Sequence, residues 1–123
     1  MNKQEIIDLL KNDIQKFNEY REKDKNICLD LREADLGKVD LRGANLRDTD
    51  LRNAYLWKAD LRGCDLRESD LWKADLRCAD LRDSYLRGAD LCDADLWKAD
   101  LRGADLCDAD LRGADLLDAK FDK

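Results

Sequence analysis

A leucine stands at every fifth position from Leu31 to Leu116, eighteen times in succession, and Phe121 occupies the next place. The residue two places before each of these positions is alanine in thirteen of nineteen cases. The exceptions are Leu29, Val39, Thr49, Cys64, Ser69 and Ser84. This spacing predicts a chain that repeats one short structural unit nineteen times.

An interval of five residues fits neither a straight helix nor a straight strand. On an α-helix each step advances the side chain by about 140° beyond a full turn, which scatters the leucines around the cylinder. On a flat strand an odd step places successive leucines on opposite faces. The chain must therefore bend once per repeat and point each leucine at a common axis, as in a β-solenoid. Coils stacked about 4.8 Å apart then pair their backbones and place leucine over leucine, and crowding inside a narrow coil explains the alanines.

The sequence Ala-Asp-Leu-Arg-Gly, found at residues 59–63 and 99–103, resembles the A-(D/N)-L-x-x signature of the pentapeptide-repeat family. The resemblance covers residues 29–123. It implies an all-β solenoid, a right-handed quadrilateral β-helix of about five coils with four repeats in each coil. The spacings alone leave the number of sides open, because some residue types recur at twenty and others, such as Trp57 and Trp72, at fifteen.

Residues 2–22 are expected to form one amphipathic helix, which begins at a capping box of Asn2 and Glu5. Its apolar residues are Ile6, Ile7, Leu9, Leu10, Ile14, Phe17 and Tyr20. Residues 1–28 are therefore interpreted as an N-terminal helical cap with a linker, and residues 29–123 as the β-helix. The segment from Leu9 to Arg21 also resembles those that precede the repeats in many family members. A membrane-surface or partner-binding helix is the weaker alternative, because the segment carries no net charge.

The opposite end of the solenoid lacks a predicted covering element. Leu116, Leu117 and Phe121 are expected to form an edge there, with Leu117 at an outward place that arginine usually occupies. Because open solenoid edges attract a mate, we expect a homodimer through the C-terminal coil.

The charge pattern excludes several partners. The chain has a formal charge of −6 and 42% charged residues, with acid and base interleaved, so we expect no nucleic-acid binding. No apolar run suits a membrane span or a signal peptide, so a cytoplasmic protein without membrane contact is expected. Five cysteines without a C-x-x-C pair, and no histidine, favour reduced thiols and no metal site.

The outward positions are dominated by aspartate before the leucine and arginine after it, which we expect to neutralise one another in neighbouring columns. Three tryptophans interrupt the arginine positions. In a four-sided coil, Trp57 and Trp97 share a side with Tyr55, and Arg77 lies between the two indoles. This set is either a cation–π stack that shields itself or a protein-docking patch.

No catalytic residue, cofactor or metal ligand is predicted. Without histidine a hydrolytic triad cannot be assembled, and no phosphate-binding loop is present. A non-catalytic structural or protein-interaction scaffold is therefore the expected function. The alternative is a DNA-mimicking binder of type II topoisomerase, similar to the quinolone-resistance members of the family, although arginine beside nearly every aspartate weakens the negative stripe that mimicry requires.

Overall fold

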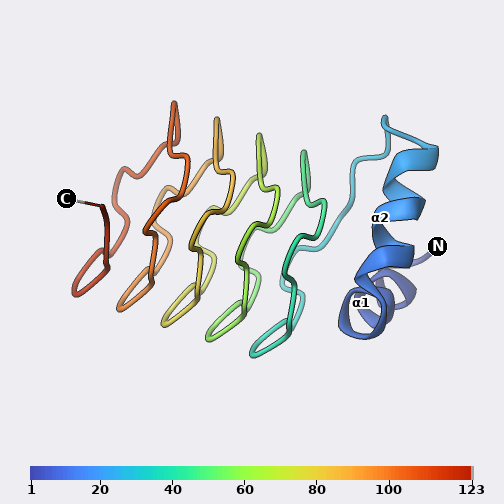
Figure 1. Cartoon of the computed structure of the whole chain (residues 1–123), viewed down its shortest axis with the longest axis horizontal. Coiled ribbons are helices and arrows are strands. Elements are labelled where there is room, and N and C mark those ends of the chain that lie inside the picture. The colour runs from blue at the N-terminus through green and yellow to red at the C-terminus, as the bar shows by residue number, and fades with distance from the viewer. Residues whose placement is uncertain (123) are drawn as a thin grey trace.

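Parallel bridges join residues twenty positions apart throughout the repeats, from Asp30 with Asp50 to Asp100 with Lys120. In this computed structural model, which describes residues 1–122, each coil therefore contains four pentapeptides, one on each side. Figure 1 shows the coils stacked into a rod with two helices at its N-terminal end. The twenty-residue coil aligns Trp57 and Trp97 on one side and places Trp72 on another.

Each side of a coil is held by a pair of backbone hydrogen bonds to its neighbours. The Leu31 amide donates to the Asp50 carbonyl at 2.8 Å, and the Asp50 amide donates to the Leu29 carbonyl at 2.9 Å. Within the described residues these contacts form isolated bridges and not longer strands. The short bridges follow from the bend in every repeat, which leaves too few extended residues for a strand.

A turn separates successive sides. The Ala34 amide donates to the Leu31 carbonyl at 3.1 Å, and Glu33, the third residue of this turn, has a φ of 60°. The equivalent residue has a positive φ in every repeat from Glu33 to Asp118, and it is glycine at five of these places. The turn therefore requires a left-handed residue even where the side chain is large.

The interior contains the predicted leucine ladders. Leu36, Leu56, Leu76 and Leu96 are completely buried, and so is Cys64. The inward polar residues satisfy their hydroxyls locally: Ser69 donates to the Leu66 carbonyl at 2.6 Å and Ser84 to the Leu81 carbonyl at 2.7 Å. Inward polar residues therefore leave no unpaired group in the core.

The single N-terminal helix expected over residues 2–22 is wrong, because two helices form: α1 (Lys3–Asn12) and α2 (Ile14–Lys23). Asp13 interrupts them with a non-helical backbone, and its carboxylate accepts from the Lys16 amide at 3.0 Å. The chain turns at Asp13 because this side chain caps a new helix there. The capping box of Asn2 and Glu5 at the start of α1 is confirmed.

The two helices cover the first coil with an apolar face. Leu10 and Phe17 are buried in the same core as the first leucines, together with Ile6 and Ile7. Neither helix is long and apolar enough to cross a membrane, within the described residues.

Candidate functional site

Four columns of outward residues follow the leucines, one along each side of the rod. We call the side formed by residues 34–38, 54–58, 74–78, 94–98 and 114–118 the aromatic side, because its column reads Gly37, Trp57, Arg77, Trp97, Leu117. The side formed by residues 39–43, 59–63, 79–83 and 99–103 is called the paired side, because arginine follows the leucine in each of its four repeats. These two adjacent sides differ most in their chemistry.

Lysines, and not Arg77, cover the indoles of the aromatic side. The ammonium of Lys38 lies 5.1 Å from the centre of the Trp57 ring, and that of Lys98 lies 4.6 Å from the Trp97 ring. The cation–π stack expected from Arg77 is therefore wrong in its partner. A lysine at the corner of the coil reaches an indole more readily than Arg77, which is already held by a carboxylate.

Arg77 makes a bidentate ion pair within its own repeat. Its Nη2 lies 2.6 Å from Asp75 Oδ2, and its Nε donates to Asp75 Oδ1 at 2.8 Å. The guanidinium hydrogen bonds lower the pKa of Asp75 below its usual value of 3.8. Arg77 thus stands as a fixed charge between the two indoles.

Trp57, Arg77 and Trp97 line one shallow hollow of about 210 Å³, together with Lys58 and Cys78. The Trp57 indole packs toward Gly37 of the preceding coil, where an added methyl group would lie 2.5 Å from Nε1. Tyr55 lies on the same side, with 49% of its surface exposed. The structure therefore gathers Trp57, Arg77 and Trp97 around one hollow, while Tyr55, the fourth residue proposed from the sequence, lies on the same side but does not line the hollow.

The paired side carries an unbroken ladder of ion pairs. Arg62 Nη2 lies 2.7 Å from Asp60 in its own repeat, and its Nε lies 3.6 Å from Asp80 in the next coil. Arg42 and Arg82 make the same two contacts, whereas Arg102 pairs, among residues 1–122, only with Asp100 because the equivalent residue in the next coil is Lys120. Hydrogen bonds from Arg102 lower the pKa of Asp100 to about 2. The predicted neutralisation of aspartate columns by arginine is thus confirmed on this side.

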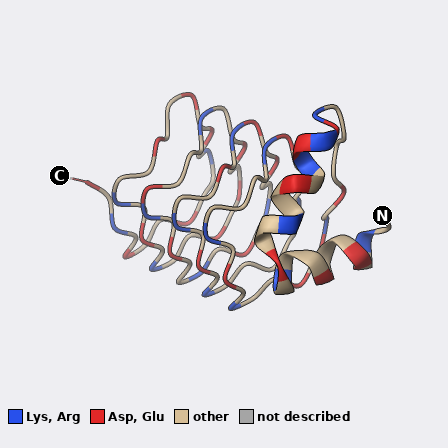
Figure 2. Cartoon of the chain, turned by 45° about the vertical axis from the view of Figure 1, so that its right-hand side comes forward, with Lys and Arg blue, Asp and Glu red and all other residues tan. Residues whose placement is uncertain are grey.

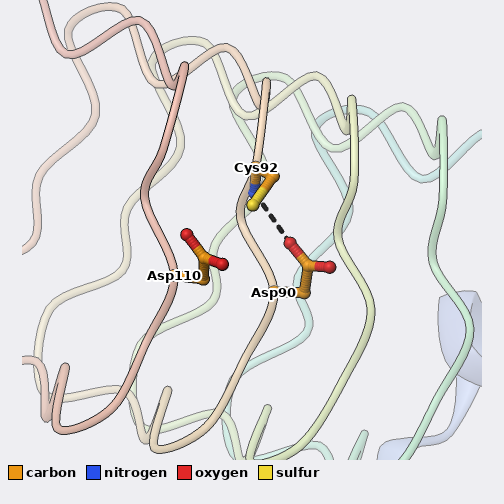
Figure 3. Close-up of side chains that lie close together, drawn as sticks. All are labelled: Asp90, Cys92 and Asp110. Carbon is orange, nitrogen blue, oxygen red and sulfur yellow. Dashed lines mark hydrogen bonds between the residues drawn. The ribbon is translucent and has the colours of Figure 1, made fainter.

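On the side formed by residues 29–33, 49–53, 69–73, 89–93 and 109–113, the arginine column is interrupted by Trp72 and Cys92. Cys92 holds the place of an arginine between Asp90 and Asp110, and the potential ligand atoms of the three residues lie within 4.8 Å of one another (Figure 3). The Cys92 amide donates to Asp90 at 2.9 Å, while Arg112 binds Asp110 at 2.5 Å. The neighbouring carboxylates of Asp90 and Asp110 raise the pKa of Cys92 to about 11. The thiol is therefore neutral at pH 7, and Cys92 does not supply the positive charge that arginine supplies at this position in other repeats.

Arg21 is a functional part of the cap that the sequence did not reveal. Its guanidinium donates to three backbone carbonyls, those of Ile27 at 3.0 Å, Asn45 at 3.2 Å, and Arg47. Asn18 supplements it by accepting from the Asn45 amide at 2.8 Å. Both residues lie four or fewer positions from the buried Phe17, and that proximity was the only available signal. Their side chains replace the hydrogen bonds that a preceding coil would make.

The C-terminal coil has no such cover within residues 1–122. Leu117 is 63% exposed and Phe121 is 40% exposed, while Leu116 is only partly buried. The three residues expected at a dimer edge therefore lie near the open end, with Leu117 next to Trp97 in the column of the aromatic side.

Comparison with known proteins is consistent with this architecture. The family model for pentapeptide repeats matches eight copies over residues 30–67, 58–91 and 92–123. No curated protein sequence matches the chain.

Three solved structures are similar. HetL, a pentapeptide repeat protein involved in heterocyst differentiation regulation in the cyanobacterium Nostoc, is 41% identical with a TM-score of 0.70, over 73% of this chain and 44% of HetL. A pentapeptide repeat protein of the Arabidopsis thaliana thylakoid lumen is 28% identical with a TM-score of 0.58, over 74% of this chain and 60% of that protein. Rfr23 of the cyanobacterium Cyanothece is 24% identical with a TM-score of 0.51, over 86% and 94%, which shows the fold alone. The chain thus spans less than half of HetL.

The matched repeats cover most of the chain, and the coil that they build is the one seen in the structure. The chain therefore belongs to the pentapeptide-repeat family.

Proposed function

We propose that this chain is a non-catalytic scaffold whose aromatic side binds a protein partner. The observation that carries the proposal is the hollow formed by Trp57, Arg77 and Trp97. Tryptophan, tyrosine and arginine are the residues most enriched where binding energy concentrates in protein interfaces. On this side the three types lie together, and arginine is held rigid by Asp75.

Self-shielding does not account for the whole aromatic side. Lys38 and Lys98 cover the indoles, but Tyr55 and Leu117 keep about half or more of their surface exposed. Large apolar groups in one column of a regular rod offer a partner a flat, preformed surface, which lowers the entropic cost of binding. The scaffold interpretation also needs no catalytic group. Ser69 and Ser84 bond to core carbonyls, and the chain has no histidine to activate a nucleophile.

The DNA-mimic alternative receives less support from the charge arrangement. Mimicry of a duplex needs a continuous negative face, whereas on the paired side each aspartate that precedes a leucine, from Asp40 to Asp100, is matched by an arginine. No inhibition in a gyrase supercoiling assay at large molar excess would agree with the scaffold proposal.

The proposed partner site is tested by capture from the native cell with the chain as bait. Replacing Trp57 and Trp97 by serine should abolish capture of a specific protein, while W72S serves as a matched control on another side of the rod. Loss of thermal stability without loss of capture would refute the docking role.

We further propose end-to-end homodimerisation through the C-terminal coil. The exposed Leu117 and Phe121 support it, because burying them against a second copy removes apolar surface from water. Light scattering after size-exclusion should report a dimer at micromolar concentration, and L117D should reduce it to a monomer. A monomeric parent protein would contradict the proposal.

A further inference from the structure

Two opposite edges of the rod carry opposite charges. Lys38, Lys58 and Lys98 occupy the third turn position of the aromatic side, and we call this row the basic edge. Ten residues further along each coil, the equivalent turn position carries the acidic edge, which consists of Asp48, Glu68 and Asp108. Because ten residues are half of a twenty-residue coil, the two edges lie on opposite sides of the rod. Figure 2 shows how charged residues recur from coil to coil along such edges.

The six side chains are available for contacts. All are exposed and project from turns with positive φ. Within residues 1–122 none of them takes part in an ion pair, in contrast to the arginines of the paired side. Lys38 and Lys98 lie over indoles, which leaves their ammonium groups at the surface.

The two edges also match in register. The coils of residues 29–48, 49–68 and 89–108 carry one lysine on the basic edge and one carboxylate on the acidic edge, whereas the coil of residues 69–88 carries Cys78 and Gly88 at these places. Both edges thus contain charge in the first, second and fourth coils and a gap in the third. After Lys98, the next equivalent turn position on the side of the basic edge is Asp118, which lies opposite no acidic-edge residue of a copy in the same register within residues 1–122. A second copy moved sideways, without any shift along the rod, would bring lysine opposite carboxylate in all three charged coils.

We propose that the basic edge of one copy binds the acidic edge of a second copy, with the two rods parallel and in register. The antiparallel arrangement would form two of the three pairs and place the third lysine against Gly88, so the parallel one is favoured. After one contact forms, the first copy still has a free acidic edge and the second copy a free basic edge. The interface is therefore heterologous, and further copies can add side by side. It does not use the C-terminal coil. It needs no protein partner on the aromatic side, although Lys58 also lines the hollow there.

The expected association is weak and depends on salt. Exposed ion pairs contribute little individually and are screened over about 10 Å at 0.1 M salt. When one ion pair forms in this register, it brings the groups of the other two pairs close together and so raises their effective concentration. The defined register is therefore favoured over single random contacts. We therefore expect assemblies at low ionic strength and high protein concentration that dissociate as salt is added.

Sedimentation velocity at about 20 mM and about 0.5 M salt tests the proposal. K38E/K58E/K98E has two acidic edges and D48K/E68K/D108K has two basic edges, so each alone should be monomeric at low salt. An equimolar mixture of the two should form mixed complexes. A variant with all six reversals exchanges the edges and should associate with itself again. K11E/K16E/K23E, which makes the same change in net charge on the helices, should behave like the parent protein.

Several outcomes would overturn the proposal. They are a parent protein that is monomeric at low salt, reversed variants that still associate alone, and a mixture of folded variants that does not form complexes. Circular dichroism of each variant shows whether it has folded, and the acidic-edge variant is the safer test because its residues do not touch an indole. Repeating the experiment in an L117D background separates the lateral contact from an end-to-end dimer. Binding of an acidic peptide to the basic edge without self-association would also contradict the proposal.

Discussion

The first and last coils of the rod are built from the same repeat, but their exposed leucines and unpaired backbone groups are covered to different extents. At the N-terminal end, Phe17 seals the core, while Asn18 and Arg21 bond to the backbone of the first coil. At the C-terminal end, Leu106, Leu111 and Leu116 are only partly buried. The comparison shows that a leucine in this repeat is fully buried only when a neighbouring element covers it on each side along the rod; its own coil is not sufficient.

This comparison predicts the largest effect for a leucine in the middle of the rod. L61A removes a fully buried side chain between two complete coils and should lower the free energy of unfolding by about 3 kcal/mol. L116A, at the open end, should cost about 1 kcal/mol, because part of that side chain is already in water. Urea denaturation measures both values. Equal losses at the two positions would mean that burial by neighbouring coils does not set the stability.

A second prediction concerns the polar cover of the first coil. R21M keeps much of the apolar stem but removes the donors to three carbonyls, so it should cost about 2 kcal/mol. The exposed Lys23 provides the control, since K23M should change stability little. Hydrogen exchange should show faster opening of the first coil in R21M alone. An unchanged exchange rate there would show that water replaces Arg21 at no cost.

The break between the helices can be tested in the same way. D13A removes the cap of α2 and should cost about 1 kcal/mol. The exposed Lys16 supplies a matched control, because K16A leaves the cap acceptor in place. If D13A fused the two helices into one and raised stability, the role assigned to Asp13 would be wrong.

The smallest effect on stability per substituted residue is expected in the ion-pair ladder of the paired side. Hydrogen bonds from arginine lower the pKa of Asp40 and of Asp100 from 3.8 to about 2. A carboxyl whose pKa is lowered by folding stabilises the protein above its unfolded pKa, and this contribution is lost as pH falls. The melting temperature should therefore decrease as pH falls from about 4 to about 2.

Replacing Arg42, Arg62, Arg82 and Arg102 by glutamine should flatten that decrease. The same replacement of Arg47 and Arg87, which follow Asn45 and Tyr85 and not aspartate, is the control and should flatten the decrease much less, because these arginines act on Asp65 and Asp105 only through longer-range charge. A pH profile that is identical in all three proteins would count against the ladder.

The leucine interval was sufficient to predict the bend in each repeat, the inward alanines and the outward aspartate and arginine columns. These features follow from geometry that every repeat shares, so one local rule determines them all. The number of sides did not follow from the interval, because a five-residue unit can close into coils of different size. It depends on backbone turns such as the one at Glu33, whose conformation the residue type does not dictate.

The candidate site was predicted as a set of residues but not in its contacts. Trp57, Arg77 and Trp97 lie together because they share one position within the coil, and Tyr55 lies two residues before Trp57 on the same side. Which neighbour each side chain contacts depends on competition among the nearby charged groups. Asp75 binds Arg77, and Lys38 and Lys98 cover the indoles instead. Arg21 was missed because two of its three carbonyl partners, those of Asn45 and Arg47, lie 24 and 26 residues further along the chain, and no local pattern reveals them.

The twenty-residue coil makes position around the rod a matter of counting. Deleting one pentapeptide between Trp57 and Trp97, such as residues 84–88, would rotate everything after it by a quarter turn and move Trp97 to a neighbouring side. Deleting four consecutive pentapeptides would restore the alignment and bring the two indoles one coil closer. A chain of this kind therefore keeps its surface columns aligned only when insertions or deletions are whole coils of twenty residues. Its changes in length are constrained by rotation about the rod axis as much as by packing.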